Sequence, residues 1–255
     1  MLGLPMPASA PKLYVVPASH PCAAVEAALE LKGIDYKRVE LLPLSQVLVG
    51  PLLYGGVTVP GMRVDGQRLA GSRAIMHRVE ELAPEPPLLP APGDARYARV
   101  LEAERWGDEV FQAVPRRLID AAFLRNPRAM ESYADPDELP LPLWMLRPSQ
   151  PLIARAMALR NKARDENARA DLLGLPAQLQ RIDDWVDDGL LGGQAPNAAD
   201  LQIGSTIRLL ASIRDVLPLI EGRPAAALSR YFPPLRGEVP PGALPAEWIP
   251  APAQA

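Results

Sequence analysis

The chain has 255 residues, of which 48% are hydrophobic and 22% charged, proportions typical of a globular protein rather than a disordered one. Its formal net charge is −3, and the acidic and basic residues are interspersed, which excludes the basic footprint typical of nucleic-acid-binding proteins. This length suffices for one large domain or two ordinary ones.

Cysteine and histidine are scarce. Cys22 is the single cysteine and cannot form an internal disulfide, and His20 and His77 lie far apart without a CxxC pair, so no metal site is expected. No apolar stretch approaches about eighteen residues, so we expect no membrane span. The first ten residues lack the basic region of a signal peptide, and we interpret them as a disordered start. These features predict a cytoplasmic protein.

The first elements in chain order alternate between strand and helix. Residues 12–16 (KLYVV) are β-branched and aromatic, which predicts a buried strand. Residues 21–32 show helical spacing and end at Gly33, a suitable residue after a helix. Residues 36–41 predict a second strand, and this order predicts a parallel pair with a right-handed crossover.

An irregular stretch then leads to a hairpin and a third helical pattern. The hairpin spans residues 57–71 and turns at Asp65-Gly66, a dipeptide suited to type I′ turns. Pro60 near its start is expected at an edge, at a bulge or in a cis bond. The following helix covers residues 72–82, with Ser72 expected as its N-cap.

A proline-rich segment separates these elements from the rest of the chain. Residues 83–94 contain five prolines, which predicts a semi-rigid linker. We therefore expect one domain over residues 1–83, ordered from about residue 11, a linker over 84–93 and a second domain over 94–255.

The second domain is predicted to be all helical. Its first helical pattern runs to about residue 124 with Pro115 as a kink or break, and a proline-rich excursion follows over residues 126–151. Residues 152–171 and 176–188 resume helical spacing. Asn197 as N-cap with Asp200 three residues later predicts a capping box before a buried helix. A proline-rich tail follows, with Trp248 and Ile249 as candidate anchors.

This organisation resembles the cytosolic glutathione S-transferase superfamily, which combines a thioredoxin-like α/β N-terminal domain with an all-α C-terminal domain. The resemblance covers nearly the whole chain, and it implies glutathione as co-substrate and a homodimer. Four motifs carry it: PASHPC at residues 17–22, Val59-Pro60, GSRAI at residues 71–75 and NAAD at residues 197–200.

The resemblance assigns roles to three positions. In that family the residue that matches Ser19 donates a hydrogen bond to the sulfur of glutathione. The backbone of the residue before the cis-proline, here Val59 before Pro60, pairs with the cysteinyl part of the tripeptide. The serine that opens the next helix, here Ser72, receives the γ-glutamyl carboxylate, and a helix N-terminus favours such an anion on physical grounds.

One position departs from the family pattern. The residue before that serine is usually acidic or an amide and contacts the γ-glutamyl amine, whereas this chain has Gly71. Either another residue meets the amine, for example from a partner subunit, or the bound thiol is a different low-molecular-weight thiol such as mycothiol. Arg73 could add affinity for a carboxylate, although an exposed arginine in a first helical turn is commonly only solvated.

Ser19 is the first candidate for the chemistry. A free thiol has a pKa near ~8.5, so little of it is thiolate at neutral pH. A hydrogen bond to the charged sulfur contributes roughly 1.5 to 3 kcal/mol, and the adjoining helix N-terminus ~0.3 to 1 kcal/mol more. That sum lowers the thiol pKa by about two units. The alternative is that Ser19 only caps the helix.

Cys22 is the second candidate, either as a thiol exposed at a helix start or as a small hydrophobe facing the core. His20 could contact substrate or face solvent, and solvent is the simpler interpretation. Arg105 and Trp106 are the main candidates for an electrophile pocket, because the first long helix of the second domain borders that cleft in related proteins. Further candidates for the same pocket are Phe111, Arg116, Arg117 and Trp144.

The sequence therefore predicts a glutathione transferase-like enzyme that conjugates a thiol to an apolar electrophile. Two alternatives stay open: a monothiol reductase that depends on Cys22, and a non-catalytic thioredoxin-like scaffold that binds a partner. Fold similarity does not choose among them, since function depends on the site.

Overall fold

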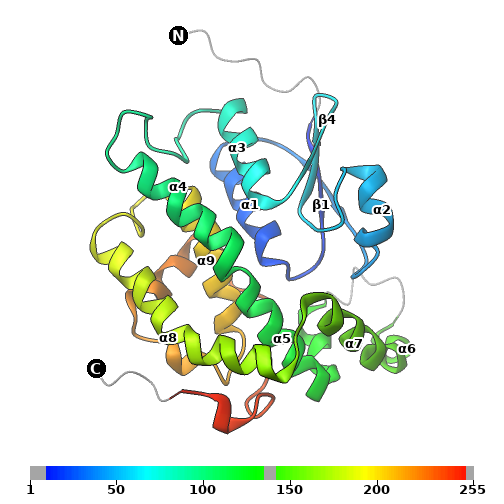
Figure 1. Ribbon diagram of the computed structural model, residues 1–255. Helices are drawn as coiled ribbons and strands as arrows, with labels where there is room; N and C mark the ends of the chain where they lie inside the picture. Colours follow the sequence, from blue (N-terminus) through cyan, green and yellow to red (C-terminus); the bar gives the residue numbers. More distant parts are fainter. Residues whose placement is uncertain (1–9, 135–141, 251–255) are drawn as a thin grey trace.

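The computed structural model describes residues 10–134 and 142–250 (Figure 1). The start that the sequence suggested to be disordered, the last five residues of the tail and residues 135–141 of the proline-rich excursion lie outside these ranges.

A four-stranded mixed sheet organises the first part of the chain, with the order β2-β1-β3-β4. β1 (Lys12–Val15) pairs in parallel with β2 (Lys37–Glu40), and its other edge pairs antiparallel with β3 (Gly61–Val64). β3 continues through the predicted turn into β4 (Gln67–Ala70). The predicted β-α-β unit and hairpin are confirmed.

Two helices share the core beneath this sheet. α1 (His20–Leu31) and α3 (Ser72–Leu82) are in contact and lie on the same side of the sheet (Figure 1). Their apolar side chains share one buried cluster with those of the strands. The spacing of Val25 and Leu29 in α1, and of Ile75 and Val79 in α3, follows from the helical period, and all four side chains are fully buried.

α3 begins one residue earlier than a cap at Ser72 implies. Gly71 occupies the N-cap position and Ser72 is the first helical residue, which corrects the predicted role of Ser72 as N-cap. The backbone of Gly71 has φ +93, a conformation that residues with a Cβ rarely adopt. A glycine therefore suits the abrupt step from strand β4 into the helix.

The irregular stretch contains a helix that the sequence did not predict, α2 (Gln46–Leu53), with Pro51 inside it. Gly50 allows tight packing there, because a Cβ at this position would lie 2.2 Å from the carbonyl oxygen of Gly56 and 2.7 Å from the Tyr54 hydroxyl. The stretch is rich in leucine and glycine and was expected to be irregular, but it contains a short helix that contacts β3.

The second part is helical, apart from an isolated β-bridge between Ile213 and Val239 in the described chain. A π-helical turn at Gly107–Phe111 separates the first two helices, and several short 3-10 turns follow. The α-helices are α4 (Tyr97–Trp106), α5 (Ala113–Arg125), α6 (Leu143–Leu146), α7 (Gln150–Asn161), α8 (Asp165–Asp187) and α9 (Ala198–Ala211).

Two predicted breaks lie elsewhere. Pro115 falls in the first turn of α5, where a missing N–H costs little, and the irregularity is the preceding π-helical turn. Pro176 lies inside α8, so the predicted boundary at this residue is wrong. The chain instead breaks at Lys162, which has a left-handed backbone with φ +56.

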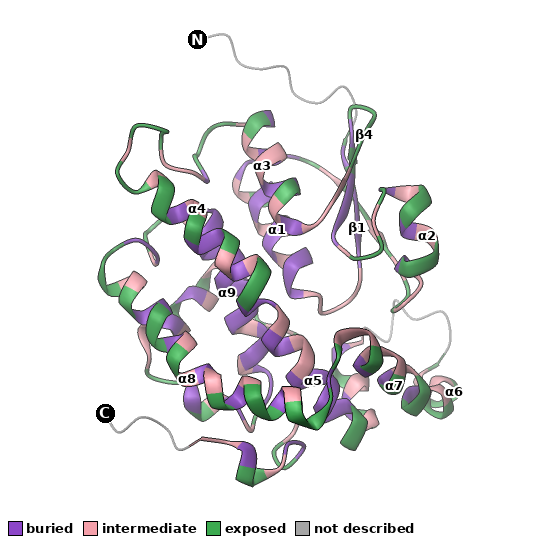
Figure 2. Ribbon diagram, viewed as in Figure 1, coloured by how far each residue is buried: buried purple, intermediate pink, exposed green. Residues whose placement is uncertain are grey.

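α9 is the buried centre of the helical part, as predicted (Figure 2). Asn197 Oδ1 accepts hydrogen bonds from the backbone N–H of Ala199 (2.9 Å) and of Asp200 (3.0 Å), and Asp200 Oδ2 accepts from Asn197 N (2.9 Å). The predicted capping box is thereby confirmed.

The tail after the last helices is anchored at Trp248. This side chain is buried, and the guanidinium of Arg125 lies 4.7 Å from the centre of its ring.

α9 also packs against α1, and this contact joins the two parts of the molecule. The apolar core under the sheet includes Ala198 and Leu201 from α9 and Phe232 from the segment after it. None of the helices in the described ranges is long and apolar enough to cross a membrane. The domain boundaries at residues 83 and 94 stay a prediction.

Candidate functional site

A cavity of about 790 Å³ is lined by residues at the N-terminal end of α1 and by residues of α5 and α7. Figure 1 shows the arrangement of these helices. Its wall from the first part of the chain consists of residues 16–20, 40–44, 46, 58 and 59. The wall from the helical part is largely apolar but includes charged and amide side chains. That wall is formed by Arg116, Ile119, Asp120, Phe123, Met130, Tyr133, Ala134, Met157, Arg160, Asn161 and Leu209.

Three residues singled out in the sequence meet at this cavity. Ser19, His20 and Val59 all line it, and the Val59–Pro60 peptide bond is cis, one of the three geometries expected for that proline. Ser19 lies at the N-cap position of α1, yet its side chain makes no capping hydrogen bond to the helix. The geometry therefore disagrees with the alternative in which the Ser19 hydroxyl only caps the helix.

Cys22 lies in the first turn of α1 and faces the core. Its side chain is 2% exposed, belongs to the apolar cluster under the sheet and does not line the cavity. Burial raises the pKa of the Cys22 thiol to about 12, and a hydrogen bond with Ser19 only partly opposes this rise. The thiol is protonated at neutral pH, and the side chain behaves as a small hydrophobe.

His20 does not face solvent, which corrects the simpler expectation for this residue. Its side chain is 2% exposed because the helical part covers it. Burial, and then the nearby charge of Arg116, lower the pKa of His20 well below its ordinary value, so the ring is neutral. Its Nε2 atom has no hydrogen-bond partner among the described residues.

The predicted carboxylate site at the start of α3 lies beside the cavity rather than in its wall. Ser72 is buried, and its Oγ has no hydrogen-bond partner within the described ranges. The backbone N–H of Gly71 donates to the carbonyl of Pro60 at 2.9 Å, which fixes the turn before the helix. The first N–H groups of α3 have no partners within their own helix and point out of its end.

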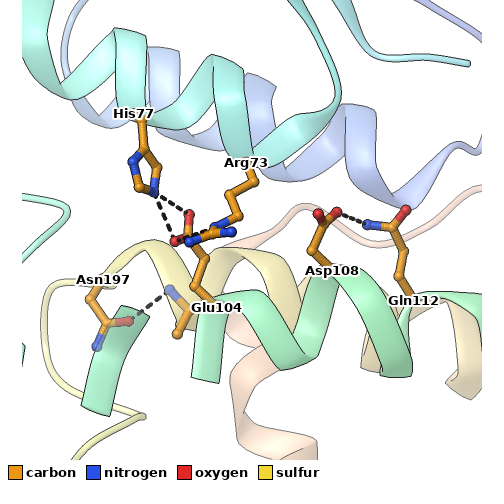
Figure 3. Close-up of polar contacts among 7 residues, drawn as sticks. Arg73, His77, Glu104, Asp108, Gln112 and Asn197 are labelled. Atoms are coloured by element: carbon orange, nitrogen blue, oxygen red, sulfur yellow. Dashed lines mark hydrogen bonds and ion pairs between the residues drawn. The ribbon is translucent and has the colours of Figure 1, made fainter. Parts of the chain in front are cut away.

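Arg73 is engaged elsewhere (Figure 3). Its Nε donates to Oε2 of Glu104 in α4 at 3.2 Å, and His77 also bonds to this carboxylate. Glu104 is fully buried and thus ties α3 to α4. Close by, the side-chain amide of Gln112 donates to Asp108 Oδ1 at 3.0 Å.

Arg105 and Trp106, the main candidates for the electrophile pocket, are not brought to the cavity. Arg105 is exposed, and Trp106 stacks on Phe111 with ring centres 5.1 Å apart. Both lie too far toward the start of the helical part, before the π-helical turn that leads into α5. Of the further candidates Arg116 lines the cavity, Phe111 is a core residue, Arg117 pairs with Asp171 and Trp144 is exposed.

The sequence interpretation missed Asp120 and Asn161, which lie in the cavity wall. Arg116, Ile119, Asp120 and Phe123 are spaced three and four residues apart, so they share one face of α5. That spacing was the available signal, but it does not reveal which face meets the cavity. Across the described residues, no cluster of three or more His, Cys, Asp or Glu side chains is arranged to hold a metal ion.

Comparison with known proteins places these features in context. Residues 13–87 match the family model described as glutathione S-transferase, N-terminal domain. No curated protein matches the chain.

Several solved structures share its fold at low sequence identity. The beta-etherase LigF from Sphingobium sp. strain SYK-6 has a TM-score of 0.59 and 20% identity, over 80% of this chain and 84% of that one. A maleylacetoacetate isomerase from Anaeromyxobacter dehalogenans 2CP-1, solved with bound GSH, has a TM-score of 0.53 and 23% identity, over 91% and 98%. A Tau class glutathione S-transferase from mango, Mangifera indica, has a TM-score of 0.54 and 16% identity, over 95% and 93%.

Proposed function

Because residues 13–87 form a glutathione S-transferase N-terminal domain in a chain with the architecture of that superfamily, we propose that the protein activates the thiol of glutathione and directs it at an apolar electrophile. The resemblance and the two-part fold predicted from the sequence are confirmed at this level. The reaction and the roles of individual residues are the proposal.

One observation carries the proposal: Ser19 and a largely apolar helical wall face the same cavity. Ser19 and Val59 lie on the side of the thioredoxin-like part, where the thiol would bind. Ile119, Phe123 and Met157 lie on the helical side, where an apolar electrophile would be shielded from water. Such a cavity can hold both reactants together, which removes much of the entropic cost of their encounter.

Ser19 would stabilise the thiolate. Its hydroxyl, free of a capping bond, donates a hydrogen bond to the charged sulfur, while the N-terminal end of α1 adds a favourable dipole. The thiolate then attacks the electrophilic carbon and forms a carbon–sulfur bond. The electron pair of the bond that breaks departs with the leaving group or, in an addition, moves onto the electrophile and takes up a proton. The product is a thioether.

Ser72 would receive the γ-glutamyl carboxylate. A carboxylate there would meet both the unpartnered Oγ of Ser72 and the free N–H groups at the start of α3. Gly71 has no side chain for the γ-glutamyl amine, and Arg73 is occupied by Glu104. A thiol without a γ-glutamyl group therefore remains an alternative co-substrate to be tested alongside glutathione.

Calorimetric titration with glutathione tests the proposal. We expect wild-type protein to bind with a dissociation constant in the micromolar to low millimolar range. Ser72→Ala should weaken binding roughly tenfold, the loss of one hydrogen bond to a charged group. Ser229→Ala is a matched control, since that hydroxyl donates to the nearby carbonyl of Ala226 and does not line the cavity. Absence of binding to glutathione and to mycothiol would reject the proposal and favour the scaffold alternative.

The alternative of a monothiol reductase is less compatible with the site. Such an enzyme needs a thiolate at neutral pH that small disulfides can reach. Cys22 is buried away from the cavity, and its pKa is raised to about 12 by that burial.

The proposal includes an oligomeric state and a cellular location. We expect a homodimer, which sedimentation velocity would detect, and a cytoplasmic location, which fractionation of the source cells would detect. A partner subunit could also supply the contact to the γ-glutamyl amine that Gly71 does not make.

A further inference from the structure

A buried carboxyl interrupts the apolar wall of the cavity. Asp120, on the cavity-facing side of α5, is 0% exposed. Its Oδ2 accepts a 2.7 Å hydrogen bond from the side-chain amide of Asn161, at the end of α7. Its Oδ1 has no hydrogen-bond partner among the residues that the structure describes. A buried polar atom without a hydrogen-bond partner destabilises the fold. A polar group of a bound ligand could supply the missing hydrogen bond to this oxygen.

The surroundings of Asp120 are those of a binding subsite rather than of a structural ion pair. Asn161 also lines the cavity, so the pair lies in its wall. Ile119 and Phe123, which flank Asp120 on the same face of α5, present apolar surface to the same space. No salt bridge to Asp120 occurs within the described ranges.

On this basis we propose that Asp120 and Asn161 form a polar subsite for a hydroxyl group on an otherwise apolar, uncharged electrophile. This inference rests on the proposed function, since it specifies the substrate class of the same cavity. The apolar body of the ligand would lie against Ile119 and Phe123, with its hydroxyl on Asp120 Oδ1.

The charges around the cavity favour a neutral hydroxyl over an ion. Arg116, one turn before Asp120, and Arg160, next to Asn161, both line the cavity without an ion pair in the described part of the chain. These guanidinium groups disfavour an ammonium group on the ligand. A carboxylate on the ligand would instead meet the ionised form of Asp120 at close range.

A hydroxyl also suits both protonation states of Asp120. Burial raises the pKa of this carboxyl to about 7, which the Asn161 hydrogen bond and the charge of Arg116 only partly oppose. Both forms are therefore populated near neutral pH. A hydroxyl donates to the carboxylate and accepts from the carboxylic acid, so it keeps a hydrogen bond in either form.

Three small aromatic probes test the subsite by calorimetry on the full chain: 2-naphthol, naphthalene and 2-methoxynaphthalene. We expect wild-type protein to bind 2-naphthol about 10- to 100-fold tighter than the other two, the effect of one hydrogen bond to a charged group. Asp120→Leu keeps the branching at Cγ but removes the polar atoms, and should leave affinity differences of about onefold among the three probes, that is, no preference. Asp120→Asn keeps a polar partner and should retain part of the preference.

A control variant separates this role from a structural one. Asp187→Leu makes the same change at an exposed position of α8 that does not line the cavity, and should keep the preference for 2-naphthol. Equal binding of the three probes by wild-type protein, or a preference that survives in Asp120→Leu, would overturn the subsite. If Asp120→Leu does not fold, Asp120→Asn and Asn161→Leu replace it. Both should reduce the preference for 2-naphthol, and an unchanged preference in both would overturn the subsite.

Failure of the subsite can be distinguished from failure of the proposed function, because binding of the aromatic probes is measured without a thiol. A preference for 2-naphthol that depends on Asp120 supports the subsite even where glutathione does not bind. Glutathione binding with no hydroxyl preference overturns the subsite and leaves the proposed function intact.

Discussion

Nε2 of His77 lies 2.8 Å from Oε2 of Glu104 and joins α3 to α4 across the two parts of the molecule (Figure 3). Glu104 is fully buried, whereas the His77 side chain is 36% exposed. A buried carboxylate needs partners of opposite charge or hydrogen-bond donors, and His77 and Arg73 supply them here.

The first prediction concerns the stability of this contact with pH. The hydrogen bond to Glu104 raises the pKa of His77 above 6.5, while burial and the charge of Arg73 oppose it and Glu81 adds to it. A raised folded-state pKa gives a stabilisation that is fully present below pH ~6.5 and is lost as the pH rises through the folded-state value. His77→Gln should lower the free energy of unfolding by about 0.5 kcal/mol near pH ~6 and by less near pH ~8, after solvent screening.

Urea denaturation at several pH values measures this difference. Arg99→Gln is the matched control, because it removes the arginine of an exposed ion pair with Asp188 and involves no histidine. A deficit of His77→Gln that stays constant or grows with pH would contradict the assignment.

The second prediction concerns Ser19. Ser19→Ala should raise the thiol pKa of bound glutathione by about one to two units and lower kcat/KM at neutral pH roughly 10- to 100-fold. The loss should shrink at alkaline pH, where the thiol ionises without help. Ultraviolet thiolate absorbance and the pH profile of kcat/KM measure the two effects, and an unchanged thiol pKa would exclude the role.

The third prediction concerns Cys22, which packs in the core beneath the sheet. Cys22→Ala should keep transferase activity and cost about 1 kcal/mol of stability through the small cavity left behind. Activity assays and thermal unfolding on the same preparation separate the two effects. Loss of activity in a folded Cys22→Ala protein would favour the reductase alternative.

The fourth prediction concerns the cap of α9. Asn197→Ala should lower the free energy of unfolding by about 1 to 2 kcal/mol, because the Asn197 side chain accepts two backbone N–H groups and donates to the carbonyl of Leu190. Arg164→Ala is the control, since Arg164 is at the N-cap of α8 but makes no capping bond. Equal effects of the two substitutions in urea denaturation would show that the capping bonds contribute nothing.

Local signals predicted much of the fold. The hairpin follows from Asp65-Gly66, both of which have positive φ as a type I′ turn requires, and the start of α9 follows from Asn197 and Asp200. Glycine and proline led to wrong predictions of helix boundaries at positions where tertiary packing overrides helix propensity. Gly50 permits the close approach to Gly56 that holds α2, and Pro176 is accommodated inside a long helix.

The candidate site was predictable only on one side. Ser19 and Val59 belong to short motifs near strands, so their positions follow from local sequence. The other wall depends on how α5 and α7 pack against residues 16–20, which no local pattern encodes. For the same reason His20 was expected in solvent but is buried, and Asp120 was not anticipated.

The contact between α1 and α9 bears on how this protein can change over time. The core beneath the sheet includes Ala198, Leu201 and Phe232 from the helical part. Neither half of the molecule could therefore be transferred to another protein with its core intact. A chimera that paired residues 10–83 with a foreign helical half would need apolar side chains of matching shape at these three positions. Substitutions on the inner face of α1 and on α9 should therefore be inherited as compensating pairs, and the two halves of the molecule would diversify together.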